Sequence, residues 1–227
     1  MKEYEDVIEQ RKSFFLENYP LVSKIYHKPY NMPELDPLRH EISLSIMFGL
    51  HQAAITLTNH LIEWFIKLIL IYNESISNNR PINKNKSIVD NIEEHFSGGV
   101  DNYISKDMSE TIRKAKSLGL ITKEQWKELD KIREDYRNAF GHADSSKIFK
   151  DLEIGLTGLS TENNQFRSEE EISKKIAKMP MIQGVLKVKF AQAHSVPYFT
   201  YVDKLIRETL LKLFPKIEDD NKFEKPI

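Results

Sequence analysis

Apolar residues recur every three or four positions over a long stretch of this chain, Ile42–Ile71. This spacing lines one face of an α-helix, whose period is 3.6 residues, and does not suit a strand, whose period is two. Asp36 and Pro37 precede the stretch and predict its start, because Asp caps free N–H groups and Pro tolerates the first helical position. We therefore expect one long helix over residues 36–72, with Gly49 as the one place where it bends.

The composition favours helices in the rest of the chain as well. Its 227 residues include only 8 glycines, too few for the many tight turns of a sandwich or a barrel. The absence of cysteine excludes disulfides, thiolate nucleophiles and Cys-ligated metal sites. A formal net charge of −1 excludes a general positive field, so any contact with nucleic acid must be local.

The remaining boundaries come from capping residues, prolines and glycines. Thr122 and Gln125 form a capping box, which predicts a helix that ends near Gly141. Residues 151–190 stay ambiguous, because two short runs with a period of two suit either a small two-stranded insertion or helix ends. The other predicted elements are a helix over 3–18 within an N-terminal extension (1–35), an irregular connection containing Pro20, Pro29 and Pro33, a short helix Ile88–Phe96 stopped by Gly98-Gly99, a helix Met108–Leu118 ending at Gly119, a final helix Pro197–Phe214 and a charged tail (215–227). The main helical domain is thus expected over 36–214.

Several classes of function lack their motifs. The chain has no P-loop, dinucleotide-binding, α/β-hydrolase or HExxH zincin signature. His60 and Glu63 lie three positions apart on the long helix, a spacing that suits a metal only if a second helix adds ligands, and no matching pair occurs. The N-terminus has acids where a signal peptide is basic, and the most apolar run is too short and too charged for a bilayer. We expect a cytoplasmic protein without membrane, metal or cofactor.

The segment with the clearest chemical content is Arg137-Asn138, followed after three further residues by His142. One interpretation is structural: Gly141 stops the helix and His142 interacts with the last carbonyls. The other follows from a resemblance. The sequence resembles the HEPN superfamily, whose motif is an Arg, usually a polar residue such as Asn next, and a His after four to six intervening residues.

This resemblance covers roughly residues 36–214 and implies an all-α, antiparallel HEPN-like bundle. It also implies a metal-independent endoribonuclease that works as a homodimer, with one motif from each subunit facing a shared cleft. RNA carries its own nucleophile, the 2′-OH, so the site must move protons and stabilise charge on phosphorus. His142 suits proton transfer, Arg137 suits charge stabilisation, and Asn138 orients the phosphate or the His.

Two consequences follow from the position of the motif on a helix. On an ideal α-helix, residues five apart diverge by about 140°, so Arg137 and His142 would not face one phosphate. Gly141 can break the regularity by ending the helix or by allowing a π-type bulge, and a dimer can pair Arg137 of one subunit with His142 of the other. Tyr136, just before the motif, falls on the apolar stripe, where core packing is the expected role.

The accessory residues leave alternatives open. Arg133 either pairs with a neighbouring acid or makes an accessory RNA phosphate contact. The Tyr that some HEPN toxins carry two residues after the His is replaced here by Asp144, which is either solvated or a partner of His142. The resemblance extends the expected partners to a cognate antitoxin or a defence-system protein, in a bacterial toxin, stress or antiphage setting. The rival hypothesis is a HEPN-like bundle without nuclease activity, used for dimerisation, partner binding or nucleotide sensing.

Overall fold

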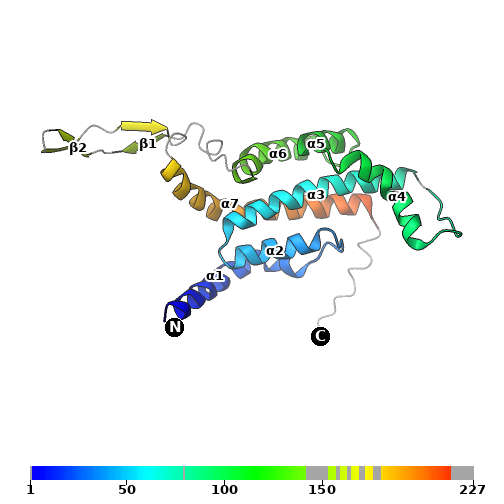
Figure 1. Cartoon of the computed structure of the whole chain (residues 1–227), viewed down its shortest axis with the longest axis horizontal. Coiled ribbons are helices and arrows are strands. Elements are labelled where there is room, and N and C mark those ends of the chain that lie inside the picture. The colour runs from blue at the N-terminus through cyan, green and yellow to red at the C-terminus, as the bar shows by residue number, and fades with distance from the viewer. Residues whose placement is uncertain are drawn as a thin grey trace.

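The computed structural model of the chain describes residues 2–78, 80–141 and 180–215, together with four short strands between 153 and 175 (Figure 1). The architecture of the described bundle is all-α, as predicted. Its helices are α1 (Lys2–His27), α2 (Asp36–Met47), α3 (His51–Asn78), α4 (Ile88–Tyr103), α5 (Met108–Ser117), α6 (Lys123–Ile132), the π-helix η1 (Arg133–Gly141) and α7 (Pro180–Leu213).

The predicted long helix is divided into α2 and α3, and the division lies at Gly49. The φ angle of Gly49 is +74°, in the left-handed region that residues with a side chain rarely adopt. A Cβ atom here would also lie 3.0 Å from the ring of Phe14 in α1. The expected bend is therefore a full reversal, and the apolar stripe becomes the contact between α2 and α3 (Figure 1).

The start of α2 differs from the prediction in its capping. The Asp36 carboxylate does not cap α2; it accepts the backbone N–H groups of Tyr30 and Met32 at 2.8 and 3.1 Å. It also accepts from Nε of Arg39 at 2.8 Å, and the same Arg donates to two carbonyls at the end of α1. Asp36 thus fixes the turn between α1 and α2, because its carboxylate satisfies turn amides rather than helix amides.

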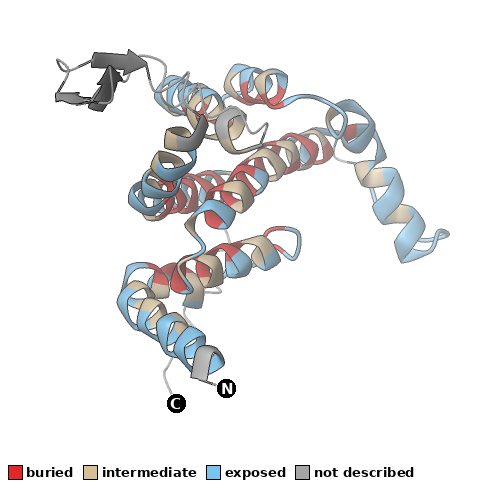
Figure 2. Cartoon of the chain, turned by 60° about the vertical axis from the view of Figure 1, so that its left-hand side comes forward, coloured by how far each residue is buried: buried red, intermediate tan, exposed pale blue. Residues whose placement is uncertain are grey.

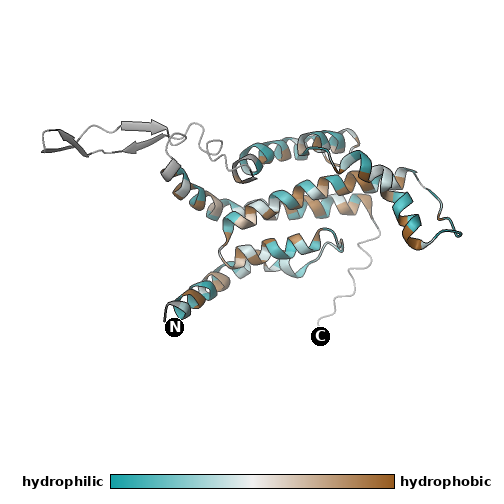
Figure 3. Ribbon diagram, viewed as in Figure 1, coloured by the Kyte–Doolittle hydropathy of each residue, from teal (hydrophilic) through white to brown (hydrophobic). Residues whose placement is uncertain are grey.

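The core of the bundle is centred on α3, which packs against α2, α4, α5, η1 and α7 (Figure 2). By length and composition α3 is apolar enough to cross a membrane, but 67% of its most apolar window is buried inside the protein. Its hydrophobic surface therefore serves packing in this structure (Figure 3). The largest fully buried side chains are Phe65, Phe199, Leu35, Ile42, Ile46, Met47, Ile55, Leu61, Ile62, Ile66, Ile69 and Leu70.

The two longest core helices, α3 and α7, lie side by side and run in the same direction. His51 at the start of α3 contacts Ser195 near the middle of α7, and Tyr72 packs edge-on against Phe214 near the ends of both helices. Between them in the chain, α6 and η1 run the opposite way, so that α7 begins at the same end of the bundle as α3 (Figure 1). The predicted antiparallel arrangement therefore holds for α3 with α6–η1, but not for α3 with α7.

The glycine pair of α4 does not stop the helix, so this prediction is wrong. The helix continues to Tyr103, and Gly99 is buried against α3. A Cβ on Gly99 would lie 3.0 Å from the Cα of Ile71, which shows how closely the two backbones approach. Gly99 thus serves helix packing, since only a residue without a side chain fits there.

The capping predictions for α5 and α6 are confirmed. Gly119 follows α5 with a φ of +72°, and Thr122 with Gln125 forms the full capping box at the start of α6. Leu129 and Ile132 of the predicted stripe are buried, while Trp126, Tyr136 and Phe140 pack on the core and stay partly exposed. The stripe therefore orients α6 and η1 toward α3 and α7.

The ambiguous region resolves into strands followed by a helix. Glu153–Leu156 (β1) pairs with Ile172–Lys175 (β4), and Leu159–Glu162 (β2) pairs with Gln165–Ser168 (β3), both antiparallel. The run 186–190 is helical, because α7 already starts at Pro180. Pro197 therefore lies inside a helix rather than at its start, and Pro20 likewise lies inside α1. Both proline predictions are wrong.

Candidate active site

The segment that carries the motif is π-helical. α6 continues directly into η1, which ends at Gly141. In a π-helix the N–H groups bond to carbonyls five residues earlier, so residues five apart lie about one turn apart. Five positions also separate Arg137 from His142. The structure thus contains one of the two irregularities expected from Gly141, while His142 itself lies outside the described residues.

Arg137 is oriented by a carboxylate on the central helix α3. Its Nε donates to Oε2 of Glu63 at 3.2 Å, and Nζ of Lys67 lies 3.5 Å from the other oxygen of that carboxylate. The side chains of Arg137 and Glu63 are 29% and 25% exposed, so solvent reaches both. A bond through Nε fixes the plane of the guanidinium, whose donors form a rigid fork. Arg137 is therefore a positioned cation whose charge Glu63 partly offsets.

One of the two alternatives for Arg133, the local ion pair, is present in the structure, while a contact with RNA phosphate stays a prediction. Arg133 donates to Asp130 at 3.1 Å and contacts Glu134 at 3.5 Å, so it forms the predicted local ion pairs. The side chain of Asn138 is not among those described, and Asp144 lies beyond the described part of η1.

The carboxylate of the suggested metal pair is used elsewhere. Glu63 forms ion pairs with Arg137 and Lys67. Among the described residues, no group of three or more His, Asp or Glu side chains gathers at a distance that suits a metal ion. The described part of the bundle therefore offers no ligand set in which His60 takes part.

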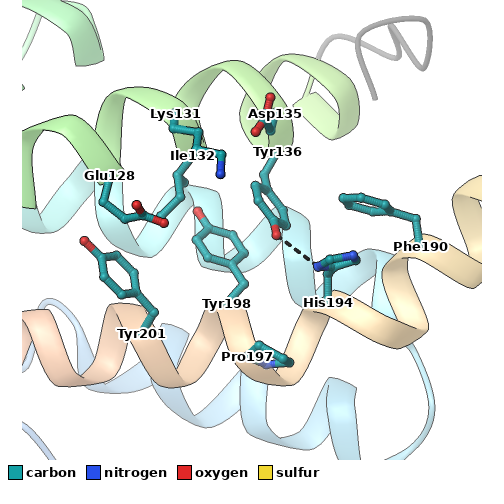
Figure 4. Close-up of a pocket in the computed structure, with 10 residues that line it drawn as sticks. All are labelled: Glu128, Lys131, Ile132, Asp135, Tyr136, Phe190, His194, Pro197, Tyr198 and Tyr201. Carbon is teal, nitrogen blue, oxygen red and sulfur yellow. Dashed lines mark hydrogen bonds between the residues drawn. The ribbon is translucent and has the colours of Figure 1, made fainter. Parts of the chain in front are cut away.

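A pocket of about 400 Å³ lies beside the motif, between α6–η1 and α7 (Figure 4). Tyr136, the residue before Arg137, forms part of its wall. Its hydroxyl group lies 3.2 Å from Nδ1 of His194 on α7. The other lining residues are Glu128, Lys131, Ile132, Asp135, Phe190, Pro197, Tyr198 and Tyr201. A hollow of this volume lined by rings and charged groups is typical of a small-molecule or base site.

The rings of this pocket are stacked in two groups. Phe190 and His194 stack at 4.1 Å between centroids, and Tyr136 lies 4.6 Å from Tyr198. Phe140 continues the first group at 6.1 Å from Phe190. These contacts hold η1 against α7, since aromatic pairs at such distances add to the burial of their area.

The charged residues at the pocket act on its phenols. Burial raises the pKa of Tyr136, and the nearby carboxylates of Asp135 and Glu128 raise it further. Burial, with Glu128 and Glu208 as secondary causes, raises the pKa of Tyr201 to about 12. Both phenols therefore stay protonated near neutral pH and can donate hydrogen bonds.

No family of proteins, characterised protein or solved structure matches this chain. The HEPN assignment therefore stays a proposal that rests on the motif and on its position in the bundle.

Sequence reasoning missed two features of this site. It considered Glu63 only as a metal ligand, because the 74 positions between Glu63 and Arg137 give no local signal of contact. It also missed the pocket face of α7. A signal was present there: Phe190, His194 and Tyr198 follow one another at four-residue intervals, which places three rings on one helix face.

Proposed function

We propose that the chain is a metal-independent endoribonuclease of the HEPN type. The observation that carries this proposal is the state of Arg137. Its guanidinium is partly exposed and oriented by Glu63, and it stands on a π-helical segment that leads to His142. Single turns of π-helix are frequent at functional sites, where they redirect side chains that a regular helix would point apart.

The proposed reaction needs few groups. His142 accepts the proton of the ribose 2′-OH, the 2′-oxygen bonds to phosphorus, and the bond from phosphorus to the 5′-oxygen breaks as that oxygen takes up a proton from the protonated imidazole, which restores neutral His142. The products are a 2′,3′-cyclic phosphate and a 5′-hydroxyl end. Arg137 stabilises the charge that develops on the phosphoryl oxygens. Asn138 orients the phosphate or the imidazole.

The proposal includes a homodimer in which two motifs face one cleft. This assembly and a role in bacterial toxin, stress or antiphage systems with an antitoxin or defence partner follow from the HEPN resemblance alone, whereas the proposed cytoplasmic location follows from the N-terminal sequence and the hydropathy of the chain. RNA is the proposed substrate because the 2′-OH is the nucleophile, and DNA lacks it.

A second function has one observation in its favour. The Arg137–Glu63 contact reduces the net positive charge at the motif, and Arg133 is likewise paired with acids. A bundle of this kind without nuclease activity would serve dimerisation, partner binding or nucleotide sensing. In that case Arg137 and Glu63 form a structural link between η1 and α3.

Cleavage of RNA in excess EDTA separates the two functions. We expect the purified protein to cleave a mixed RNA panel and to leave 2′,3′-cyclic phosphate ends, while DNA of the same sequence stays intact. The Arg137→Ala and His142→Ala variants are expected to cleave RNA about 100-fold or more slowly, which is the usual effect of removing a general acid–base or a group that stabilises charge. Arg113→Ala, an exposed cation on α5, is the matched control and is expected to keep full activity.

Folding and assembly must be unchanged for these losses to count as catalytic. Circular dichroism and light scattering of each variant check this. If the unmutated protein leaves the whole panel intact, the nuclease proposal is wrong. If it cleaves but Arg137→Ala and His142→Ala cleave equally well, the motif is not the site.

A further inference from the structure

The aromatic pocket between α6–η1 and α7 has no role in the proton transfers proposed above. Its wall includes Tyr136, the residue before Arg137 in the chain, although Arg137 itself does not line the pocket and bonds to Glu63 on α3. The wall on α7 supplies the rings of Phe190, His194 and Tyr198, as Figure 4 shows. Bases of single-stranded RNA bind proteins by stacking on such rings.

The opposite wall carries two solvent-exposed charged side chains, Glu128 and Lys131. Glu128 and Lys131 lie three positions apart on α6, so they project from neighbouring places on one helix face. Both line the pocket, and neither forms an ion pair with any residue in the described part of the chain. The pocket therefore presents a carboxylate and an ammonium group on its α6 wall, with the rings of α7 on the other wall (Figure 4).

This combination discriminates among the four bases. The Watson–Crick edge of guanine has a carbonyl oxygen next to two N–H donors. A Lys ammonium donates to the carbonyl oxygen, and a carboxylate accepts from both N–H groups. Adenine and cytosine each offer an amino group beside an acceptor nitrogen, and uracil offers one N–H between two carbonyls. Each of these three bases can therefore bond to Lys131 and Glu128 through one acceptor and one donor, whereas guanine alone offers two adjacent N–H groups that use both carboxylate oxygens.

A further polar group lies at the same end of the pocket. The hydroxyl of Tyr201 is buried and has no hydrogen-bond partner among the described residues. Its neighbour Glu128 lies close enough to affect its protonation. A buried hydroxyl without a partner costs free energy, and a ligand that reaches it removes that cost.

We propose that this pocket is a base-binding subsite that selects guanine in the RNA substrate next to the cleaved phosphate. The base extends the ring stack of α7, Lys131 donates to its carbonyl oxygen, and Glu128 accepts from its two N–H groups. This inference rests on the proposed ribonuclease function for the position of the base relative to the cleaved bond, but binding itself requires no cleavage.

Binding is therefore measured on the full-length His142→Ala protein, which separates recognition from reaction. Fluorescently labelled RNA 8-mers of uridine with one central guanosine are compared with the same RNAs carrying adenosine, cytidine or inosine. Guanosine is expected to bind about tenfold or more tightly than adenosine, the scale of one lost set of base contacts. Inosine keeps the carbonyl and one N–H but lacks the amino group, so its affinity is expected to fall between the two.

Three substitutions test the named contacts in the same background. Phe190→Leu keeps an apolar side chain but removes one stacking face, and is expected to weaken binding of every RNA about tenfold. Glu128→Gln and Lys131→Gln are expected to remove most of the preference for guanosine while retaining stacking. Lys127→Gln changes a lysine on the same helix outside the pocket and is the matched control, with the preference unchanged.

Free guanosine monophosphate distinguishes a substrate subsite from a nucleotide-sensing site. Guanosine-containing RNA is expected to bind more tightly than the free nucleotide, which competes only at high concentration. Binding of the nucleotide as tightly as the RNA would overturn the substrate role.

Equal binding of all four RNAs, or a preference that survives Glu128→Gln and Lys131→Gln, would overturn the subsite. If guanosine RNA binds through these residues but is never cleaved, the nuclease proposal fails and the guanine subsite stands. If RNA is cleaved without any base preference, the nuclease proposal stands and the guanine subsite fails.

Discussion

The close packing of α4 against α3 at Gly99 can be tested by substitution, with the adjacent Gly98 as the matched control. Replacing Gly98 or Gly99 by Ala adds one methyl group to the same turn of the same helix, and each change gains about 1 kcal/mol of helix propensity. At Gly99 the new Cβ would meet the backbone of Ile71 at 3.0 Å. At Gly98 it would meet only a carboxylate oxygen of Glu74 at 3.3 Å, at the end of a flexible side chain.

The two substitutions are expected to change stability in opposite directions. Overpacking against a backbone costs about 1–3 kcal/mol, because the neighbouring helix must move. Gly99→Ala is thus expected to be neutral to about 2 kcal/mol destabilising, and Gly98→Ala to be up to about 1 kcal/mol stabilising. For a chain of this size, the difference of about 1–3 kcal/mol corresponds to roughly 2–12 °C in Tm.

Urea denaturation followed by circular dichroism measures this difference, with calorimetry for Tm. The slope of the unfolding free energy with urea must stay equal among the variants for the comparison to hold. If Gly99→Ala is as stable as Gly98→Ala, then α4 does not approach α3 as closely as described, and the packing argument for Gly99 is refuted.

Three further predictions concern capping, protonation and assembly. Thr122→Ala removes the capping box of α6 and is expected to lower the unfolding free energy by about 1 kcal/mol, measured by urea denaturation; no loss would mean that the cap is not formed in solution. Burial lowers the pKa of His51 from 6.5, so the unfolded chain binds this proton more readily than the folded protein. The free energy of unfolding that neutral His51 contributes above pH 6.5 is therefore lost as the pH falls through 6.5 toward the lowered pKa. Comparison with His51→Gln between pH 7.5 and 5.5 checks this, because the variant is expected to lose less stability over that range. The protein is expected to form a dimer whose interface buries at least ~1,000 Å² in total. Light scattering at micromolar concentration checks the dimer, and a monomer would contradict the shared cleft.

Local signals in the sequence predicted the parts of the fold that depend on local chemistry. The capping box at Thr122 and the helix end at Gly119 need only neighbouring residues, and both are in place, whereas at Gly49 the predicted bend is a full reversal that divides the helix in two. Pro197 was misread because local rules make a proline a helix start. In α7 the helix instead passes through it, since flanking residues such as Ser195 and Phe199 are buried against the bundle. Tertiary packing outweighs the lost backbone hydrogen bond there.

The candidate site shows the same division. The position of Arg137 in a segment that continues a capped helix was predicted, and the π-type irregularity before Gly141 was one of the alternatives given. The contact of Arg137 with Glu63 was not readable, because it depends on how η1 packs across α3. The pairing of Arg133 with its acidic neighbours was predicted as one of two alternatives, since the partners lie within one turn.

The parallel pairing of α3 and α7 has a consequence for biosynthesis. His51 and Ser195 meet across the centre of the protein although 144 positions separate them. At about 5–20 residues per second, a ribosome needs on the order of ten seconds to make the chain between them. During that time the apolar face of α3 that α7 later covers is exposed on a nascent chain, and contacts of such long range also slow folding after release. The protein therefore reaches its native core only when its last helix has left the ribosome, so chains cut short before α7 are expected to aggregate or be degraded rather than fold.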